Sequence, residues 1–371
     1  MAKNKYWDIR NILSRNAHYN IVFGERSNGK TYGTLNLGLE RYFSGHGKMA
    51  IIRRWEEDFR GKQAITMFDS LVMNGVVTRL SKGRWNDIVY QSHRWYLCKR
   101  DISNPKNIVI DESPFAYAFA LSSEEHYKSS SYPEITLIIF DEFLTRNVYL
   151  PDEFIKFTSI LSTIIRLRTN VIIFMLGNTV NQYSPYFTEM GLTNIKKMER
   201  GKIDVYRYGD SGLTVAVEFS DFPTKEKKSN MYFAFNNPKL EMIRTGAWEM
   251  DIYPHLPMKY KPKDVIYMYF IKFDNELLQC EIIDMMDEEN NQIYFTYIHR
   301  KTTPIKEDGY SIVYSEESSP LPNHRKKITK PMSDVEKTIV SFFNRDKVFY
   351  QDNQVGEIVR NYIAWCNNKT V

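Results

Sequence analysis

The sequence has little of what marks disulfide-stabilised, zinc-binding or membrane-spanning proteins. It has three cysteines, Cys98, Cys280 and Cys366, which lie far apart and form no CxxC pair or Cys/His cluster. No apolar run approaches the ~20 residues that a membrane-spanning helix needs, and residues 1–15 are polar and charged, unlike a secretory signal. These absences argue against a disulfide framework, a zinc site and a membrane location, and they predict a protein of a reducing cytoplasm.

Internal repeats and low-complexity tracts are also missing from the 371 residues, of which 43% are hydrophobic and 26% charged. This composition is typical of globular protein, and the length allows about two domains of ~150 residues. The formal net charge is +5, and the basic surplus lies in residues 1–255. Such a surplus permits contact with a polyanion but does not require one.

The first 200 residues alternate short β-branched runs with helical patterns, which is typical of a parallel α/β sheet. Residues 135–140, apart from Thr136, and residues 171–176 are apolar runs, as expected of buried central strands. Further strands are expected at residues 19–23 and 49–52, with a helix after the first of them and another helix at residues 151–168. The pattern therefore predicts a parallel sheet covered by helices.

Beyond residue 200 the pattern changes. Residues 201–255 contain an isolated strand candidate at 213–219 and predict a small linker domain. From residue 256 onward, alternating apolar runs predict an antiparallel meander followed by two helices. The meander strands are expected at residues 265–273, 277–283 and 293–299. The first helix is expected to open with a capping box formed by Ser333 and Glu336.

A glycine-rich loop carries the strongest chemical signal. Residues 24–31 match GxxxxGK[ST] at every fixed position and lie between an expected strand and an expected helix. In such a loop, backbone N–H groups surround a phosphate and the helix N-terminus adds positive potential. Lys30 would bridge the β- and γ-phosphates of ATP, and the Thr31 hydroxyl would bind Mg²⁺. The alternative without nucleotide binding is a glycine-rich turn with a solvated lysine. The predicted ATP-binding residues are Gly24, Glu25, Arg26, Ser27, Asn28, Gly29, Lys30 and Thr31.

An acidic pair, Asp141 and Glu142, follows the buried run that ends at residue 140. Asp141 stands where a P-loop fold needs its second magnesium partner, and Glu142 is placed to orient or deprotonate an attacking water. The two acids together favour ATP hydrolysis over phosphate transfer to a small molecule. Asn178, at the end of the next apolar run, is either a sensor of the γ-phosphate or a turn residue. Arg166 and Arg168 either complement the end of their helix or reach a nucleotide.

These motifs resemble the DNA-packaging ATPases of small tailed phages of the phi-29 type. The likeness covers most of the first 200 residues and a short segment near the C-terminus. The segments that carry it are residues 19–31, 52–54, 131–133, 138–143, 150–151, 165–168, 177–178, 184–187 and 349–355. The resemblance implies a P-loop ATPase domain of the FtsK/HerA-like ASCE class at residues 1–200. A linker domain at 201–255 and a C-terminal α+β domain resembling ribonuclease H at 256–371 would follow.

The same resemblance implies a function and further site residues. It implies a homomeric ring of five subunits that docks at the portal of a procapsid in the host cytoplasm. Such a ring hydrolyses ATP to move double-stranded viral DNA inward and contacts a packaging RNA. By position, Arg166 matches the arginine finger of the family, and Lys128 matches a lysine that also reaches the ATP of the neighbouring subunit. Asn178 matches the residue that couples the nucleotide to motion.

A working nuclease of the ribonuclease H type needs clustered carboxylates on two Mg²⁺ ions. Residues 265–273 contain no acid, and Asp264 and Asp274 only flank them. Glu281 and Asp352 do not complete a cluster. We therefore expect no nuclease activity, and we expect the C-terminal domain to bind nucleic acid or the procapsid.

The residues that would contact DNA are not evident from the sequence. Basic residues gather at 79–100 and 324–327. A peripheral hairpin explains the first segment equally well, and a solvated loop explains the second better than contact with nucleic acid. Two rival functions use the same motifs. One is a hexameric helicase or recombination motor, and the other is a scaffold that binds ATP and assembles without appreciable turnover.

Overall fold

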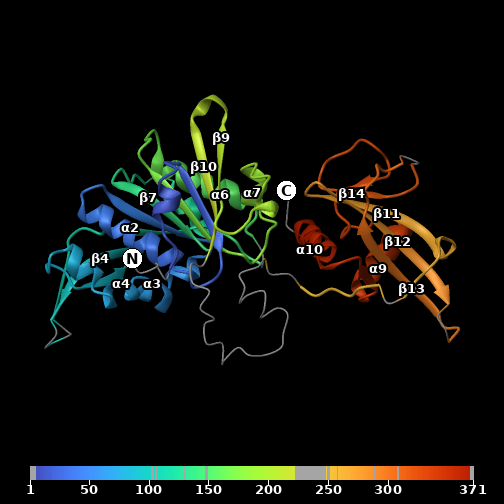
Figure 1. Cartoon of the computed structure of the whole chain (residues 1–371), viewed down its shortest axis with the longest axis horizontal. Coiled ribbons are helices and arrows are strands. Elements are labelled where there is room, and N and C mark those ends of the chain that lie inside the picture. The colour runs from blue at the N-terminus through green and yellow to red at the C-terminus, as the bar shows by residue number, and fades with distance from the viewer. Residues whose placement is uncertain are drawn as a thin grey trace. The chain divides into compact units, whose positions relative to one another are not determined.

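The computed structural model describes residues 6–101, 104, 107–128, 130–146, 149–221, 248, 251–256, 258–286, 289–306 and 309–367. Contacts divide the chain into two compact units, Met1–Glu249 and Met250–Val371 (Figure 1). No helix among the residues described is long and apolar enough to cross a membrane.

The first unit is built on a ten-stranded sheet. Its strands are β1 (Tyr19–Gly24), β2 (Lys48–Arg53), β3 (Asp87–Gln91), β4 (Arg94–Arg100), β5 (Ile108–Ile110), β6 (Ala116–Ala120), β7 (Ile135–Asp141), β8 (Ile172–Asn178), β9 (Ile203–Tyr208) and β10 (Leu213–Ser220). The order is β3-β4-β6-β2-β7-β8-β1-β10-β9, and β5 pairs with β4. Neighbours from β6 to β10 run parallel, while the outer strands are antiparallel. The carboxyl ends of the parallel strands therefore share one edge of the sheet.

Helices cover both faces of this sheet (Figure 1). They are α1 (Arg10–Leu13), α2 (Lys30–Phe43), α3 (Lys62–Thr66), α4 (Asp69–Met73), α5 (Val76–Leu80), α6 (Glu153–Ile165) and α7 (Pro185–Glu189), with short turns η1 (Glu56–Phe59), η2 (Leu121–Tyr127), η3 (Ile195–Lys197) and η4 (Gly209–Ser211). On one face Val22 of β1 shares a buried cluster with Leu35 of α2. On the other face Phe140 of β7 packs against Phe157 of α6. Both faces of the central strands are buried, which explains their continuous apolar runs.

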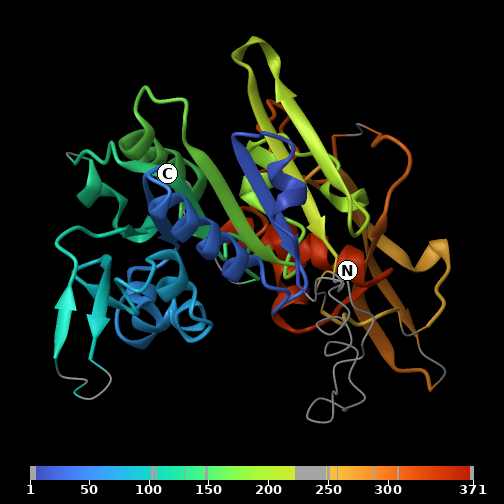
Figure 2. The same cartoon turned by 60° about the vertical axis from the view of Figure 1, so that its left-hand side comes forward.

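Residues 203–220 do not form part of a separate linker domain, contrary to the sequence-based expectation. β10 pairs in parallel with β1 along the whole length of β1, and β9 pairs with β10 to close that side of the sheet. Figures 1 and 2 show the β9–β10 hairpin extending beyond the rest of the first unit. The strand looked isolated because its partner lies near the start of the chain. Residues 222–247 of the expected linker lie outside the described residues.

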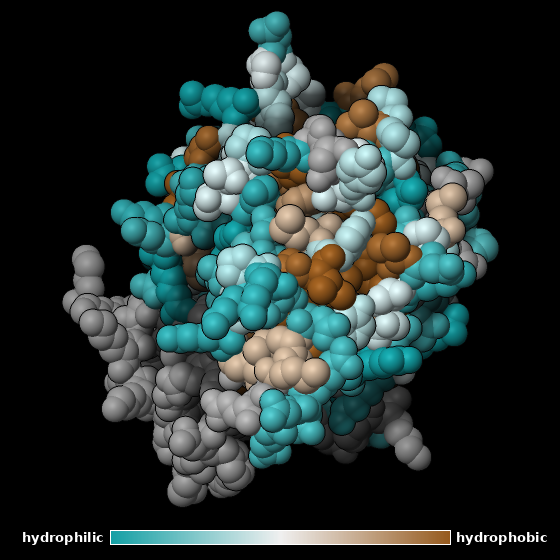
Figure 3. All heavy atoms as spheres, turned by 90° about the vertical axis from the view of Figure 1, so that its right-hand side faces the viewer, coloured by the Kyte–Doolittle hydropathy of each residue, from teal (hydrophilic) through white to brown (hydrophobic). Residues whose placement is uncertain are grey.

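The second unit contains a six-stranded sheet of order β15-β14-β11-β12-β13-β16. Its elements are η6 (Pro262–Asp264), β11 (Val265–Phe273), β12 (Glu276–Met286), β13 (Gln292–Arg300), β14 (Val313–Ser315), β15 (His324–Arg325), α9 (Asp334–Asn344), β16 (Val348–Tyr350) and α10 (Asn353–Asn367). β11, β12 and β13 are antiparallel, whereas β14 runs parallel to β11 and β15 parallel to β14. α10 packs against β11, β13 and β16. The face of this unit seen in Figure 3 is mainly hydrophilic, with hydrophobic residues scattered across it.

The expected central strands, the meander and the Ser333–Glu336 capping box are confirmed. The helix expected at residues 151–168 is shorter, because α6 begins at Glu153 and ends at Ile165. Asp152 and Arg166 flank it with φ of 51° and 52°, a left-handed backbone that cannot continue an α-helix. Pro151 therefore does not open the helix, and Arg166 lies just beyond it.

Candidate functional site

The loop at residues 24–31 joins β1 to α2, and its backbone shape depends on glycine. Gly24 has a φ of 154° and Gly29 a φ of 93°. A Cβ on Gly24 would overlap Ser220 Oγ and lie 2.8 Å from the Ser220 carbonyl oxygen. Asn28 Nδ2 donates a hydrogen bond of 2.8 Å to Ser220 Oγ. The end of β10 thus holds the loop, so residues missed by the sequence motif help to shape it.

Lys30 points back into this loop. Its side chain is almost fully buried, and Nζ donates to the Glu25 carbonyl oxygen at 2.8 Å and to Asn178 Oδ1 at 3.4 Å. Burial lowers the pKa of Lys30 to about 8, although the negative charge of Asp141 opposes this shift. The amine remains mostly protonated at pH 7 and is available to a phosphate. The structure therefore brings the side chains of Lys30 and Asn178 together.

Thr31 and Asp141 meet at the carboxyl edge of the sheet. Thr31 Oγ1 donates to Asp141 Oδ1 at 3.1 Å, and Asp141 is 5% exposed. Mg²⁺ prefers oxygen ligands and usually keeps waters and substrate phosphates in its shell, with one or two carboxylates from the protein. The hydroxyl and carboxylate oxygens of this pair fit such an ion.

Arg53, at the end of β2, occupies the other side of the acidic pair. Its Nη2 lies 2.6 Å from Asp141 Oδ2 and its Nη1 lies 3.0 Å from Glu142 Oε2. Glu142 has a φ of 62°, and its side chain is 61% exposed. No role for Arg53 was predicted from the sequence. The available signal was its position at the end of a strand that turns out to neighbour β7.

The next residue, Arg54, has a structural task. It pairs with Glu153 at the start of α6 through an Nε–Oε2 contact of 2.8 Å, and both side chains are almost fully buried. Tyr186 donates to the second oxygen of Glu153 at 2.7 Å, and Arg54 Nη2 donates to the Phe143 carbonyl oxygen at 2.7 Å. These contacts tie the end of β2 to the segment after Glu142 and to α6.

Arg166 lies far from the loop of its own chain. α6 starts beside Arg54 at the carboxyl edge of the sheet, and its 13 residues span ~20 Å towards the opposite edge. There Arg166 Nη2 donates to the Ser130 carbonyl oxygen at 3.0 Å, just before β7 begins. Arg168, in contrast, donates to the carbonyl oxygens of Pro133 and Ile135 at 2.8 and 2.7 Å, which makes it a structural residue.

Lys128 lies on the segment that leads to the same edge. Its side chain is 50% exposed, and Nζ contacts Glu125 Oε1 at 2.5 Å and Glu124 Oε2 at 3.9 Å. The structure therefore groups the predicted residues in two places. Lys30, Thr31, Asp141, Glu142 and Asn178 meet around the glycine-rich loop, whereas Arg166 and Lys128 lie apart from it.

Fold and site define the class of the protein as an α/β protein with a glycine-containing loop between a strand and a helix at the carboxyl edge of a parallel sheet. The model of the family of Podovirus DNA encapsidation protein (Gp16) matches residues 92–315, which is more than half of the chain. The chain belongs to this family. The matched range contains Asp141, Glu142, Arg166 and Asn178 and begins after the glycine-rich loop.

Individual relatives agree with this assignment. The chain is 24% identical over 233 residues to the DNA packaging protein of Bacillus phage phi29, covering 62% of this chain and 61% of the relative. It is 26% identical over 221 residues to the DNA packaging protein of Bacillus phage B103, covering 58% and 60%. The alignments thus span about three fifths of the length of these relatives.

Two solved structures share the fold. The chain is similar to the phi-28 gp11 DNA packaging motor, with a TM-score of 0.53, 19% identity and 100% of both chains covered. It is also similar to the bacteriophage phi-29 viral genome packaging motor assembly, with a TM-score of 0.55, 17% identity and 98% of both chains covered. At these identities the likeness shows the fold alone.

Proposed function

We propose that this chain is the ATPase subunit of a ring motor that moves double-stranded viral DNA into a procapsid. The observation that carries the proposal is the meeting of Lys30, Thr31 and Asp141, with Glu142 beside them, at one edge of the sheet. Family membership and relatives named as DNA packaging proteins support DNA as the cargo. The strand order also supports an ASCE-type P-loop ATPase, because β8 lies between β1 and β7 and ends in Asn178.

Each residue of the site has a role in this proposal. Residues 24–29 present backbone N–H groups to the phosphates, and Lys30 adds its positive charge. Thr31 and Asp141 would hold Mg²⁺, and the ion would supply positive charge against the phosphates. Glu142 accepts a proton from water. Arg53 holds Glu142 in the structure described, so Glu142 acts after that contact opens.

The position of Arg166 supports action on a neighbouring subunit. Arg166 lies at the edge of the sheet opposite to Lys30, and its exposed side chain bonds to Ser130, two residues after Lys128 in the chain. An arginine finger supplied by a neighbour is worth ~10³–10⁵ in rate. Hydrolysis would therefore depend on assembly. We propose a ring of five copies, docked at the portal in the host cytoplasm and in contact with a packaging RNA.

The second unit supports a binding role. Its strand order from β15 to β13, with β14 parallel to β11, supports the proposed likeness to ribonuclease H. Among the residues described, no group of three or more His, Cys, Asp or Glu could hold a metal ion. Glu281 is engaged by His299 and Gln279. We propose that this unit contacts nucleic acid or the procapsid and does not cleave DNA.

ATP turnover of the purified chain tests the function. It is measured across protein concentration, with and without long double-stranded DNA, for the wild type, Glu142→Gln and Arg166→Ala. Turnover that rises with DNA, increases more than linearly with protein and disappears in both variants supports the motor. A rate linear in protein, indifferent to DNA and unaffected by Arg166→Ala contradicts it, while unwinding of DNA would favour the helicase.

A further inference from the structure

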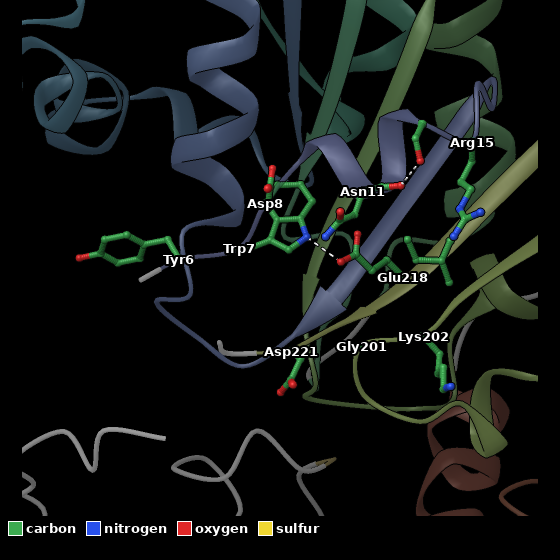
Figure 4. A pocket seen from close by; sticks show the side chains of 11 residues that line it. Tyr6, Trp7, Asp8, Asn11, Arg15, Gly201, Lys202, Glu218 and Asp221 are labelled. Atoms are coloured by element: carbon green, nitrogen blue, oxygen red, sulfur yellow. Dashed lines mark hydrogen bonds between the residues drawn. The ribbon is translucent and has the colours of Figure 1, made fainter. Parts of the chain in front are cut away.

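A pocket of about 680 Å³ opens beside the glycine-rich loop, a volume within the range of small-molecule sites. Its walls come from the N-terminal segment, the start of β9 and the end of β10. Residues that define it are Trp7, Asn11, Arg15, Lys202 and Glu218. Figure 4 shows the Trp7 indole and the Glu218 carboxyl group facing each other, with Arg15 and Asn11 nearby.

The pocket shares a wall with the loop. The backbone N–H of Trp7 donates to the Asn28 carbonyl oxygen at 2.9 Å, and its indole Nε1 donates to Glu218 Oε1 at 2.9 Å. Asn28 in turn is bonded to Ser220, two residues after Glu218 on β10. A ligand that fills the loop therefore has this pocket as its neighbour.

The sheet gives the direction in which a bound nucleotide would extend. Asp141 and Asn178, at the ends of β7 and β8, mark the terminal phosphate on one side of β1. β10 lies on the opposite side of β1, about 4.8 Å away. The nucleoside of a bound nucleotide would therefore point towards β10, where the pocket opens.

Glu218 has an unused hydrogen-bonding atom in this pocket. Its side chain is 5% exposed and its Oε1 accepts from Trp7, but its Oε2 has no partner among the residues described. Burial raises the pKa of this carboxyl group to about 7, against the opposing effect of the Trp7 hydrogen bond. A buried polar atom without a partner is costly, so a ligand that supplies one is favoured.

We propose that this pocket binds the nucleoside of ATP, with Trp7 as a wall and Glu218 Oε2 as the atom that hydrogen-bonds the adenine base. This assignment rests on the proposed ATP site, because it uses the same bound molecule. It adds residues for base recognition that the glycine-rich motif does not contain. Phosphate binding and base binding thus depend on different residues.

Calorimetric titration of the full-length chain with ATP and with inorganic tripolyphosphate separates the two contributions. Glu218→Ala is expected to weaken ATP binding about tenfold, the value of one hydrogen bond to a buried group, and to leave tripolyphosphate binding unchanged. Glu218→Gln should keep most of the ATP affinity, because the amide still hydrogen-bonds the base. Lys30→Ala should weaken both ligands.

A second measurement does not depend on the stability of the Glu218 variants. In the wild type, a methylanthraniloyl ATP analogue should receive excitation energy from Trp7, and Trp7→Phe should remove a large part of this transfer. Unchanged ATP binding in Glu218→Ala, or unchanged energy transfer in Trp7→Phe, overturns the assignment while the ATP site stands. If Lys30→Ala leaves both ligands bound as before, the ATP site itself is wrong.

Discussion

Replacing Arg53 by glutamine removes the cation that contacts both acids at the end of β7. The Asp141 side chain is 6% exposed and that of Arg53 is 18% exposed, so the pair is largely buried. Breaking a buried ion pair costs ~3–5 kcal/mol. We expect Arg53→Gln to lower the free energy of unfolding by about 3 kcal/mol. This is the lower end of the range, because Lys30 and Thr31 still interact with Asp141. The contact with exposed Glu142 adds less than ~1 kcal/mol.

Magnesium should distinguish the loss of stability in Arg53→Gln from the effect of a packing defect. Arg53 covers Asp141 Oδ2, so its removal leaves a bare carboxylate in the proposed Mg²⁺ site. Mg²⁺ with ADP should therefore stabilise Arg53→Gln more than the wild type. The difference in free energy of unfolding between the two proteins should become smaller. Urea unfolding of both proteins, first with a chelator and then with Mg·ADP, measures the free energy of unfolding in each case.

Arg54→Gln is the matched control, since it breaks the neighbouring buried pair with Glu153. It should destabilise the protein by ~3–5 kcal/mol, and that loss should not shrink with Mg·ADP. Arg53→Gln that unfolds like the wild type would contradict the proposed contribution of this ion pair. A change with Mg·ADP in the stability difference from the wild type that is equal for the two variants would contradict it as well.

Three further predictions follow from the same geometry. Arg166→Ala should leave the unfolding midpoint unchanged but reduce turnover by ~10³ or more, whereas Arg168→Ala should lower the midpoint because Arg168 bonds to two carbonyl oxygens. Affinity for tripolyphosphate should fall as pH rises from 7 to 9, since Lys30, with its pKa lowered to about 8, loses its proton; titration in buffers of different ionisation enthalpy should show proton uptake at pH 9. Glu218→Gln should be more stable than the wild type at pH 8, by up to ~3 kcal/mol, because the pKa of Glu218 is raised to about 7 in the folded chain. The cost of ionising Glu218 grows between pH 4.5 and 7, so this advantage should vanish towards pH 4.5 in urea unfolding.

The sequence predicted the features that depend on neighbouring residues. The glycine-rich loop has fixed spacing, and Asp141 follows a run of apolar residues long enough to identify a buried strand. Arg53 was missed because its partner depends on β2 lying next to β7, and strand order is not a local property. The partnership of Trp7 with Glu218 joins residues 211 positions apart, and the linker expectation failed for the same reason at β10.

The distance between the glycine-rich loop and Arg166 constrains how copies of the chain can associate. The two features face opposite edges of one sheet, so a contact that brings Arg166 of one copy to the loop of the next is heterologous, with different surfaces on each side. Two copies joined by one such contact would leave one loop and one Arg166 unmatched. An open row of any length also has one unmatched loop at one end and one unmatched Arg166 at the other. Only in a closed ring is every glycine-rich loop contacted by Arg166 of a neighbouring copy. The proposed ATP hydrolysis at every site therefore requires ring closure.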